Sequence, residues 1–205
     1  MQFDLYRFIG ECQEALTADR PLKAMREVVA RAVTEPGPLM RALGEPRRAQ
    51  IQKLHCSPEL TILNIVWAPG MSVIPHNHQM SAIIGIYAGV EDNVFWRRIR
   101  DEAGGKVEAA GAKRLVEKTA EPLGRGIIHS VVNPTTQFTG ALHVYSGDFF
   151  AAARSEWDAE TKLERPYSVE RALQQFEDAN ASLAAAAALA GKDFAGGNLA
   201  RGDYK

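Results

Sequence analysis

The middle of this chain is a succession of short apolar runs separated by turn-forming residues. The runs are rich in Val, Ile, Phe, Trp and Tyr, with Gly, Pro and Asn between them, and they cover residues 60–67, 81–90, 94–100, 114–119, 127–132 and 140–145. β-Branched and aromatic residues favour strands, and short runs without a helical period are typical of antiparallel sheets. The sequence therefore predicts a mainly β protein, built as a barrel or sandwich over about residues 60–150.

The segment before this β region carries a helical pattern. Met25 and Val29 fall on one face of a helix that Asp19 is predicted to cap, with Pro21 in its first turn. We expect this apolar face to pack on the outside of the barrel. The sequence Glu-Pro-Gly-Pro at 35–38 is predicted to end the helix, with a short helix following over 39–43.

The chain length suits one structural domain with flanking helices. Ser168 is the predicted N-cap of a helix after the barrel, and the tail from Gly196 onward has little to bury. We predict three parts of a single domain: an N-terminal helical extension (1–58), a barrel (59–165), and a C-terminal helix with its tail (166–205).

Composition and charge exclude several partner classes. Apolar residues make up 46% of the chain, enough for a substantial core, and the formal net charge of −1 gives no electrostatic case for nucleic acid or an anionic membrane surface. No apolar run approaches the roughly 20 residues needed to span a bilayer. Cys12 and Cys56 do not make a disulfide framework, so a cytoplasmic, reducing setting is expected.

The histidines are the residues most suggestive of chemistry. His76 and His78 are two apart, so in an extended segment their side chains project from the same face, and Pro75 favours that conformation. Two such imidazoles can chelate one metal ion. On its own, this pair is more often a surface or hydrogen-bonded pair than a metal site.

Two groups of residues around this pair have a characteristic spacing: Gly70, His76, His78 and Gly89, and then Pro122, Gly124, His129 and Asn133. They resemble the first and the second sequence motif of the cupin family. The resemblance implies a cupin double-stranded β-helix, a jelly-roll barrel, in which His76, His78 and His129 converge on one metal ion.

The chain departs from the first cupin motif at one ligand. The motif places a glutamate after the second histidine, where this chain has Ala82 or Ile83, depending on the alignment. Either the site has decayed or it belongs to a three-histidine subclass, and the second is favoured because all three histidines remain. Neutral ligands leave the charge of a divalent ion uncompensated, which favours binding of an anion such as a thiolate.

A further motif is the segment Ala141-Leu-His143-Val-Tyr145. It resembles the Ser-x-His-x-Tyr strand of thiol dioxygenases, the cysteine dioxygenase and 3-mercaptopropionate dioxygenase family. The resemblance implies Fe(II) as cofactor, and a small thiol and O2 as substrates. Zn or Ni can take the place of iron in crystals, because the affinity order favours these later metals over Fe(II). It also implies that His143 and Tyr145 act beside the metal, and that Arg154 binds the substrate carboxylate.

Three departures from this second family leave the substrate open. Ala141 replaces the motif serine, no cysteine stands at Ala82 or Ile83 to crosslink with the tyrosine, and residues 78–81 lack the tryptophan of bacterial members. Two alternatives therefore stay beside thiol oxidation: another metal-dependent cupin oxygenase, acting on an enediol or diketone, and a non-catalytic cupin that binds a small ligand. A homodimer is also left open.

Overall fold

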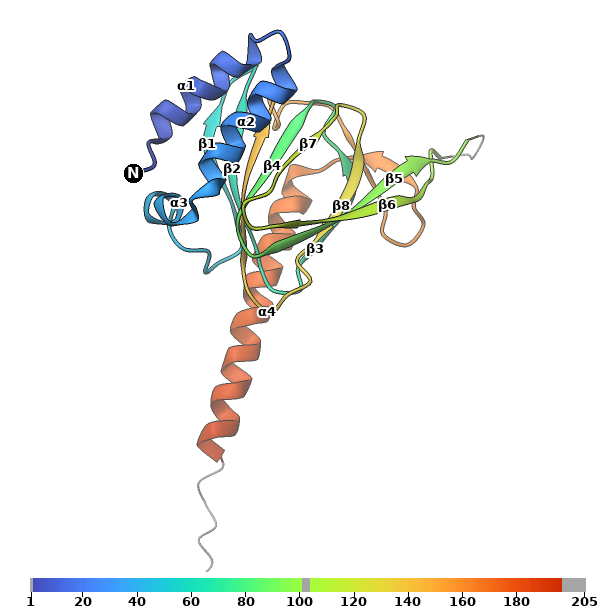
Figure 1. Ribbon diagram of the computed structural model, residues 1–205. Helices are drawn as coiled ribbons and strands as arrows, with labels where there is room; N and C mark the ends of the chain where they lie inside the picture. The colour runs from blue at the N-terminus through green and yellow to red at the C-terminus, as the bar shows by residue number, and fades with distance from the viewer. Residues whose placement is uncertain (1, 101–103, 197–205) are drawn as a thin grey trace, which may run out of the picture.

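The computed structural model describes residues 2–100 and 104–196 as two antiparallel sheets with helices on the outside (Figure 1). Five strands form one sheet in the order β1-β2-β9-β4-β7, and six form the other in the order β11-β10-β3-β8-β5-β6. The strands are β1 (Gln50–Cys56), β2 (Thr61–Trp67), β3 (Ser72–Asn77), β4 (Ala82–Ala88), β5 (Val90–Arg98), β6 (Val107–Val116), β7 (Ala120–Leu123), β8 (Ile128–Val132), β9 (Thr139–Tyr145), β10 (Ser155–Trp157) and β11 (Glu164–Pro166).

The strand order identifies the barrel as a jelly roll. Eight strands are divided between the two sheets, giving β2-β9-β4-β7 in one and β3-β8-β5-β6 in the other, with antiparallel neighbours throughout. This is the interleaved order of two Greek keys folded together. The predicted fold, a double-stranded β-helix or jelly-roll barrel that is mainly β with flanking helices, is confirmed.

Three strands of the five-stranded sheet are buried on both faces. Along β9, Ala141 and Tyr145 belong to the apolar core inside the barrel, while Leu142 and Val144 belong to a second core beneath the N-terminal helices. Alternation along a strand explains this division, since successive side chains point to opposite faces. β2 and β4 divide in the same way, so β9 can present its inward side chains from a firmly held strand.

The N-terminal helices cover the outer face of this sheet (Figure 1). They are α1 (Leu5–Leu16), α2 (Pro21–Thr34) and α3 (Pro36–Leu43). The predicted burial of the α2 stripe is confirmed, because Met25 and Val29 both lie in the second core. Gly85 of β4 allows the close approach: a Cβ at this position would lie 2.4 Å from Val29 Cγ1.

Two helix boundaries differ from the sequence prediction. The N-cap of α2 is Arg20 rather than Asp19, and it makes no side-chain capping hydrogen bond, because a guanidinium has no acceptor for the amides of the first turn. The predicted end of the helix at Glu35 is confirmed, since α2 ends at Thr34, but the short helix that follows begins at Pro36 rather than at Leu39. Proline is well tolerated there, since the first N–H groups of a helix have no intrahelical partner.

The barrel also extends beyond its predicted limits. β1 begins at Gln50, inside the segment assigned to the helical extension, and pairs with β2 over its whole length. Its sequence, QIQKLHC, lacks the apolar run or strict alternation that would reveal a strand. At the other end, β10 and β11 continue the second sheet from β3 to Pro166.

The C-terminal helix, α4 (Val169–Gly196), packs its first half on the barrel, and its second half projects away from it (Figure 1). Ser168 caps this helix as predicted, accepting a hydrogen bond from the Arg171 amide at 3.1 Å. Ala172 and Phe176 are buried against the barrel. The predicted tail lies outside the described residues, apart from Gly196. Among the described helices, none is long and apolar enough to cross a membrane.

Candidate metal centre

Three buried histidines from neighbouring strands meet inside the barrel. His76 lies on β3 directly opposite His129 on β8, and His78 follows the end of β3. A register shift between Val73 and His76, next to Pro75, bends β3 at this place. The bend and the two-residue spacing bring both imidazoles of the first motif towards His129.

The three Nε2 atoms converge. His78 Nε2 lies 3.3 Å from His76 Nε2 and 3.2 Å from His129 Nε2, and the group is close enough to hold a metal ion. Two nitrogens bound to one ion at about 2.1 Å are separated by about 3.0 Å at a right angle and by about 3.4 Å in a tetrahedron. The observed spacings fall between these values.

Hydrogen bonds turn two of these rings towards the centre. His76 Nδ1 lies 3.0 Å from the Ile74 carbonyl oxygen, and His129 Nδ1 lies 2.7 Å from Asn93 Oδ1. Both partners only accept, so each ring carries its proton on Nδ1 and leaves Nε2 bare. Metal-binding histidines are oriented in this way by the groups around them. The residues present therefore fit a divalent metal ion.

Electrostatics keep these imidazoles in the neutral, ligating form. Burial, with a smaller contribution from the Arg154 charge, lowers the pKa of His76 to about 4, although the Ile74 carbonyl opposes the shift. Burial and then the neighbouring imidazoles hold the pKa values of His78 and His129 well below 6.5. Protons therefore compete weakly with a metal at neutral pH.

The structure decides which residue stands where the cupin motif would place a carboxylate. Ala82 lies in the core inside the barrel, whereas Ile83 points to the core beneath the helices. Ala82 is therefore the inward position, and it contributes a methyl group. The metal-binding group among the described residues contains no carboxylate.

His143 and Tyr145 lie beside the histidine cluster on β9. Both are buried, and His143 Nδ1 is 3.0 Å from Tyr145 Oη. The Tyr145 ring meets the His78 ring edge-on, with centroids 5.0 Å apart. Burial raises the pKa of Tyr145 far above its usual value. The structure thus brings together the pair that the sequence selected and places it against a metal-ligand candidate.

Arg154 is a buried cation next to this cluster. Its guanidinium lies between two rings, 3.9 Å from the Phe149 centroid and 3.6 Å from the Tyr167 centroid. Nη2 donates to the Phe149 carbonyl oxygen at 3.3 Å, while Nη1 has no hydrogen-bond partner. Burial lowers the pKa of Arg154. A buried donor left unpaired in this way suits an anionic ligand.

The space at the histidines is small and mostly apolar. A cavity of about 30 Å³ is bordered by the three histidines, His143 and Tyr145, together with apolar and aromatic side chains such as Trp67, Phe149 and Phe176. Arg154 itself lines a separate hollow nearer the surface, but Phe149 and Tyr167, the rings that enclose it, border the cavity. A cavity of this size has room for only a few water molecules, so binding of a larger ligand requires movement of these side chains.

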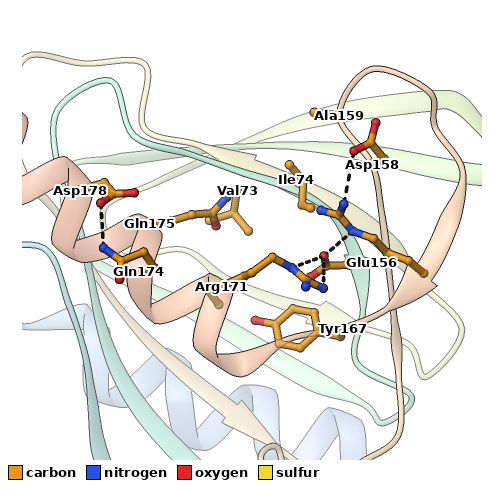
Figure 2. Close-up of a pocket in the computed structure, with 12 residues that line it drawn as sticks. Val73, Ile74, Glu156, Asp158, Ala159, Tyr167, Arg171, Gln174, Gln175 and Asp178 are labelled. Carbon is orange, nitrogen blue, oxygen red and sulfur yellow. Dashed lines mark hydrogen bonds and ion pairs between the residues drawn. The ribbon is translucent and has the colours of Figure 1, made fainter.

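A larger hollow of about 290 Å³ adjoins this cavity, and Val73, Tyr167 and Ala172 line both. Figure 2 shows Glu156 in this hollow, joined by dashed lines to Arg171. Glu156 also accepts from Arg165 at 2.7 Å. The two cations are therefore paired, and the cluster ties α4 to β10 rather than offering a site for an anion.

Sequence reasoning missed Glu91 and Asn93 of β5, and the connecting role of Trp67. All three are buried, and hydrogen bonds join Trp67 to Glu91, Glu91 to Asn93 and Asn93 to His129, while His143 Nε2 lies 3.6 Å from Glu91 Oε2. The sequence Gly-Val-Glu-Asp-Asn at 89–93 has the composition of a turn, so nothing in it signals a buried carboxylate. Asn133 of the second motif proves structural, since its amide donates to backbone carbonyl oxygens, including that of Gln137 at 2.7 Å.

The two cysteines lie away from the histidines. Cys12 is buried among the N-terminal helices, and burial raises the pKa of its thiol to about 12. Cys56 is half-buried at the end of β1, with Sγ 3.7 Å from both Thr61 Oγ1 and Asp148 Oδ1. Neither thiol has the electropositive surroundings of a nucleophile.

No protein-family model matches the chain. Solved structures with similar regions include a double-stranded β-helix cupin from Methanocaldococcus jannaschii, with 13% identity over 50% of this chain and 83% of that one, at a TM-score of 0.40. A cupin superfamily protein from Desulfitobacterium hafniense has 19% identity over 52% and 86% of the two chains, at a TM-score of 0.40.

A third similar structure is oxalate decarboxylase from Bacillus subtilis, with 17% identity over 46% of this chain and a TM-score of 0.37. This chain spans only 22% of the decarboxylase chain. At these identities and TM-scores the likeness says nothing about the reaction.

Proposed function

We propose that this protein is an iron-dependent dioxygenase that oxidises a small carboxylate-bearing thiol to its sulfinate with O2. The observation that supports this most strongly is the convergence of three neutral histidines, without a carboxylate, beside the hydrogen-bonded Tyr145–His143 pair. The conversion of R–SH and O2 to R–SO2H is balanced, so no further reductant is required.

In this proposal His76, His78 and His129 hold the metal, preferably Fe(II), although Zn or Ni would bind the same nitrogens. Bound iron would supply the redox chemistry for joining a thiol with O2, and three protein ligands would leave positions open for both. The apolar wall of the cavity, with Trp67 and Phe149, would exclude bulk water from the reacting sulfur.

Tyr145, His143 and Arg154 have separate roles. Tyr145 would place its hydroxyl over the substrate, and His143 would hold that hydroxyl in position through Nδ1. Arg154 would meet the substrate carboxylate with its unpaired Nη1, after a small movement past Phe149 or Tyr167. Catalysis would then depend on orientation and on charge placed in a dry site.

The proposed partners are a small thiol and O2, with no role for nucleic acid or a membrane; whether two copies form a homodimer is left to measurement of mass in solution. We also propose a cytoplasmic location, because both cysteines are free thiols, as is usual in reducing compartments.

The deciding experiment is O2 consumption by iron-loaded protein with 3-mercaptopropionate, cysteine and cysteamine. We expect uptake with the two carboxylate-bearing thiols, and a sulfinate product that carries two ¹⁸O atoms when ¹⁸O2 is supplied. His129→Ala, which removes a proposed ligand, is the matched control. The proposal would be refuted if the iron-loaded wild-type protein consumed O2 no faster than this control.

One observation favours a second candidate, oxidation of an enediol or diketone at the same centre. Arg154 lines a neighbouring hollow rather than the histidine cavity, so a substrate without a carboxylate could bind without involving it. Adding such compounds to the panel separates the two reactions. Retained affinity for a small ligand without any turnover would instead indicate a non-catalytic cupin.

A further inference from the structure

A buried carboxylate, Glu91, lies one layer behind the histidine cluster. It is fully buried on β5, and both of its oxygens accept hydrogen bonds: Oε2 from Trp67 Nε1 at 2.8 Å and Oε1 from Asn93 Nδ2 at 2.9 Å. These two donors are neutral. Burying a carboxylate is costly unless it is paired, so its other neighbours matter.

The ionisable group that faces Glu91 is His143. Its Nε2 lies 3.6 Å from Glu91 Oε2 and has no hydrogen-bond partner. A movement of about 0.5 Å would bring these two atoms into hydrogen-bond range. Because an ionised carboxylate only accepts, the nitrogen that faces it must carry a proton. In the neutral ring, Nδ1 then carries no proton and accepts a hydrogen bond from the Tyr145 hydroxyl.

The second oxygen of Glu91 acts on a metal-ligand candidate. By accepting from Asn93 Nδ2, it fixes which way that side-chain amide points, so Asn93 Oδ1 faces His129 Nδ1 at 2.7 Å. That acceptor keeps the His129 proton on Nδ1 and its Nε2 free for a metal. One carboxylate is therefore joined by hydrogen bonds through Asn93 to His129, and on its other side it faces His143, the hydrogen-bond partner of Tyr145.

We propose that Glu91 is a positioning residue that sets the tautomers of both His129 and His143, and so aims a metal ligand and the Tyr145 hydroxyl together. The kinetic part of this inference rests on the proposed thiol dioxygenase function. The part that concerns tautomers and metal affinity does not. Glu91 also supplies a negative charge close to a centre whose ligands are all neutral.

Glu91→Gln tests both branches. Glutamine keeps the shape but has one acceptor oxygen, so its NH2 group must face either Asn93 or the Trp67–His143 side. We expect long-range ¹H–¹⁵N NMR of the metal-free protein to show that at least one of His129 and His143 leaves its wild-type tautomer. Zn(II) affinity should fall about 10- to 100-fold if the Asn93 branch is lost.

Asn93→Ala separates the branches, and it serves if the glutamine variant fails to fold. We expect it to weaken Zn(II) binding while the Nε2–H tautomer of His143 stays as in the wild type. Tyr87→Phe is the matched control, because it removes a buried hydrogen bond, to Asn64 at 2.8 Å, from the face beneath the helices. This control should lower thermal stability and change neither tautomer nor Zn(II) affinity.

Turnover provides the remaining test. In Glu91→Gln, kcat per bound iron should fall at least 10-fold, with KM changed less than about twofold. The double variant Glu91→Gln/His143→Asn should then be no slower than His143→Asn alone, because the two residues act through one path. Wild-type tautomers in Glu91→Gln, or additive losses in the double variant, would overturn the inference. A wild type without thiol oxidation would overturn the proposed function, and the NMR and Zn(II) results would still decide the role of Glu91.

Discussion

Acidification of the metal-free protein should destabilise it through the three buried imidazoles. The pKa of His76 is about 4 in the native protein, against 6.5 for an ordinary histidine. Between these values the unfolded chain binds more protons than the native one, so the free energy of unfolding falls as the pH falls. From pH 7 to pH 5, this linkage amounts to about 2 kcal/mol for His76 alone.

Burial also holds the pKa values of His78 and His129 well below 6.5, so both histidines destabilise the protein further on acidification. Paired carboxylates are protonated mostly below pH 5. The range from pH 7 to pH 5 therefore excludes most of their contribution to the measured change in stability.

Urea unfolding at pH 7 and pH 5, in the presence of EDTA, measures the effect. We expect His76→Asn to lose about 2 kcal/mol less than the wild type on acidification, because the variant has one fewer imidazole to protonate. Tyr87→Phe should lose stability equally at both pH values, since it changes no imidazole. An equal pH difference in the wild type and in His76→Asn would show that burial does not keep this ring neutral.

Three further outcomes follow from the packing and from the site. Gly85→Ala should lower the free energy of unfolding by about 1–3 kcal/mol through overpacking, because its Cβ would lie 2.4 Å from Val29 Cγ1. Gly111→Ala is the control: its Cβ would have no atom within 4 Å, so the melting temperature should change by less than about 2 °C. Tyr145→Phe should lower turnover and leave the iron content near that of the wild type; equal losses of both would mean a structural role. Arg154→Ala should raise KM for 3-mercaptopropionate far more than for cysteamine, and equal effects would remove Arg154 from substrate binding.

The sequence predicted the parts of the fold whose patterns are strong. Runs of β-branched and aromatic residues located β2, β4, β8 and β9 to within one or two residues. It failed at β1, where a polar strand is held by its pairing with β2 and by cover from α4 rather than by its own composition. The boundary at 58 was set too late for the same reason, since tertiary pairing outweighs local propensity there.

The site divides in a similar way. Motif spacing selected His76, His78 and His129, and the structure brings them together because cross-strand pairing places His76 opposite His129. Spacing could not reveal Glu91, since its partners His143 and Trp67 belong to other strands and meet it only in the closed barrel. A carboxylate in a turn-like sequence is usually exposed, and only the tertiary structure shows that this one is buried.

The absence of a carboxylate from the histidine cluster and the presence of a tyrosine beside it have one structural explanation. Ala82 on β4 lies directly opposite Tyr145 on β9, and both side chains face into the barrel. Opposite side chains on one face have Cβ atoms about 5 Å apart, so a glutamate at 82 would compete with the phenol for the same space next to His78. The methyl group of Ala82 leaves that space to Tyr145, whose ring packs against His78. The negative charge that the motif would place at 82 is found instead at Glu91, behind His143. The two changes together give a centre with neutral ligands, a tyrosine hydroxyl beside it, and a buried carboxylate behind His143.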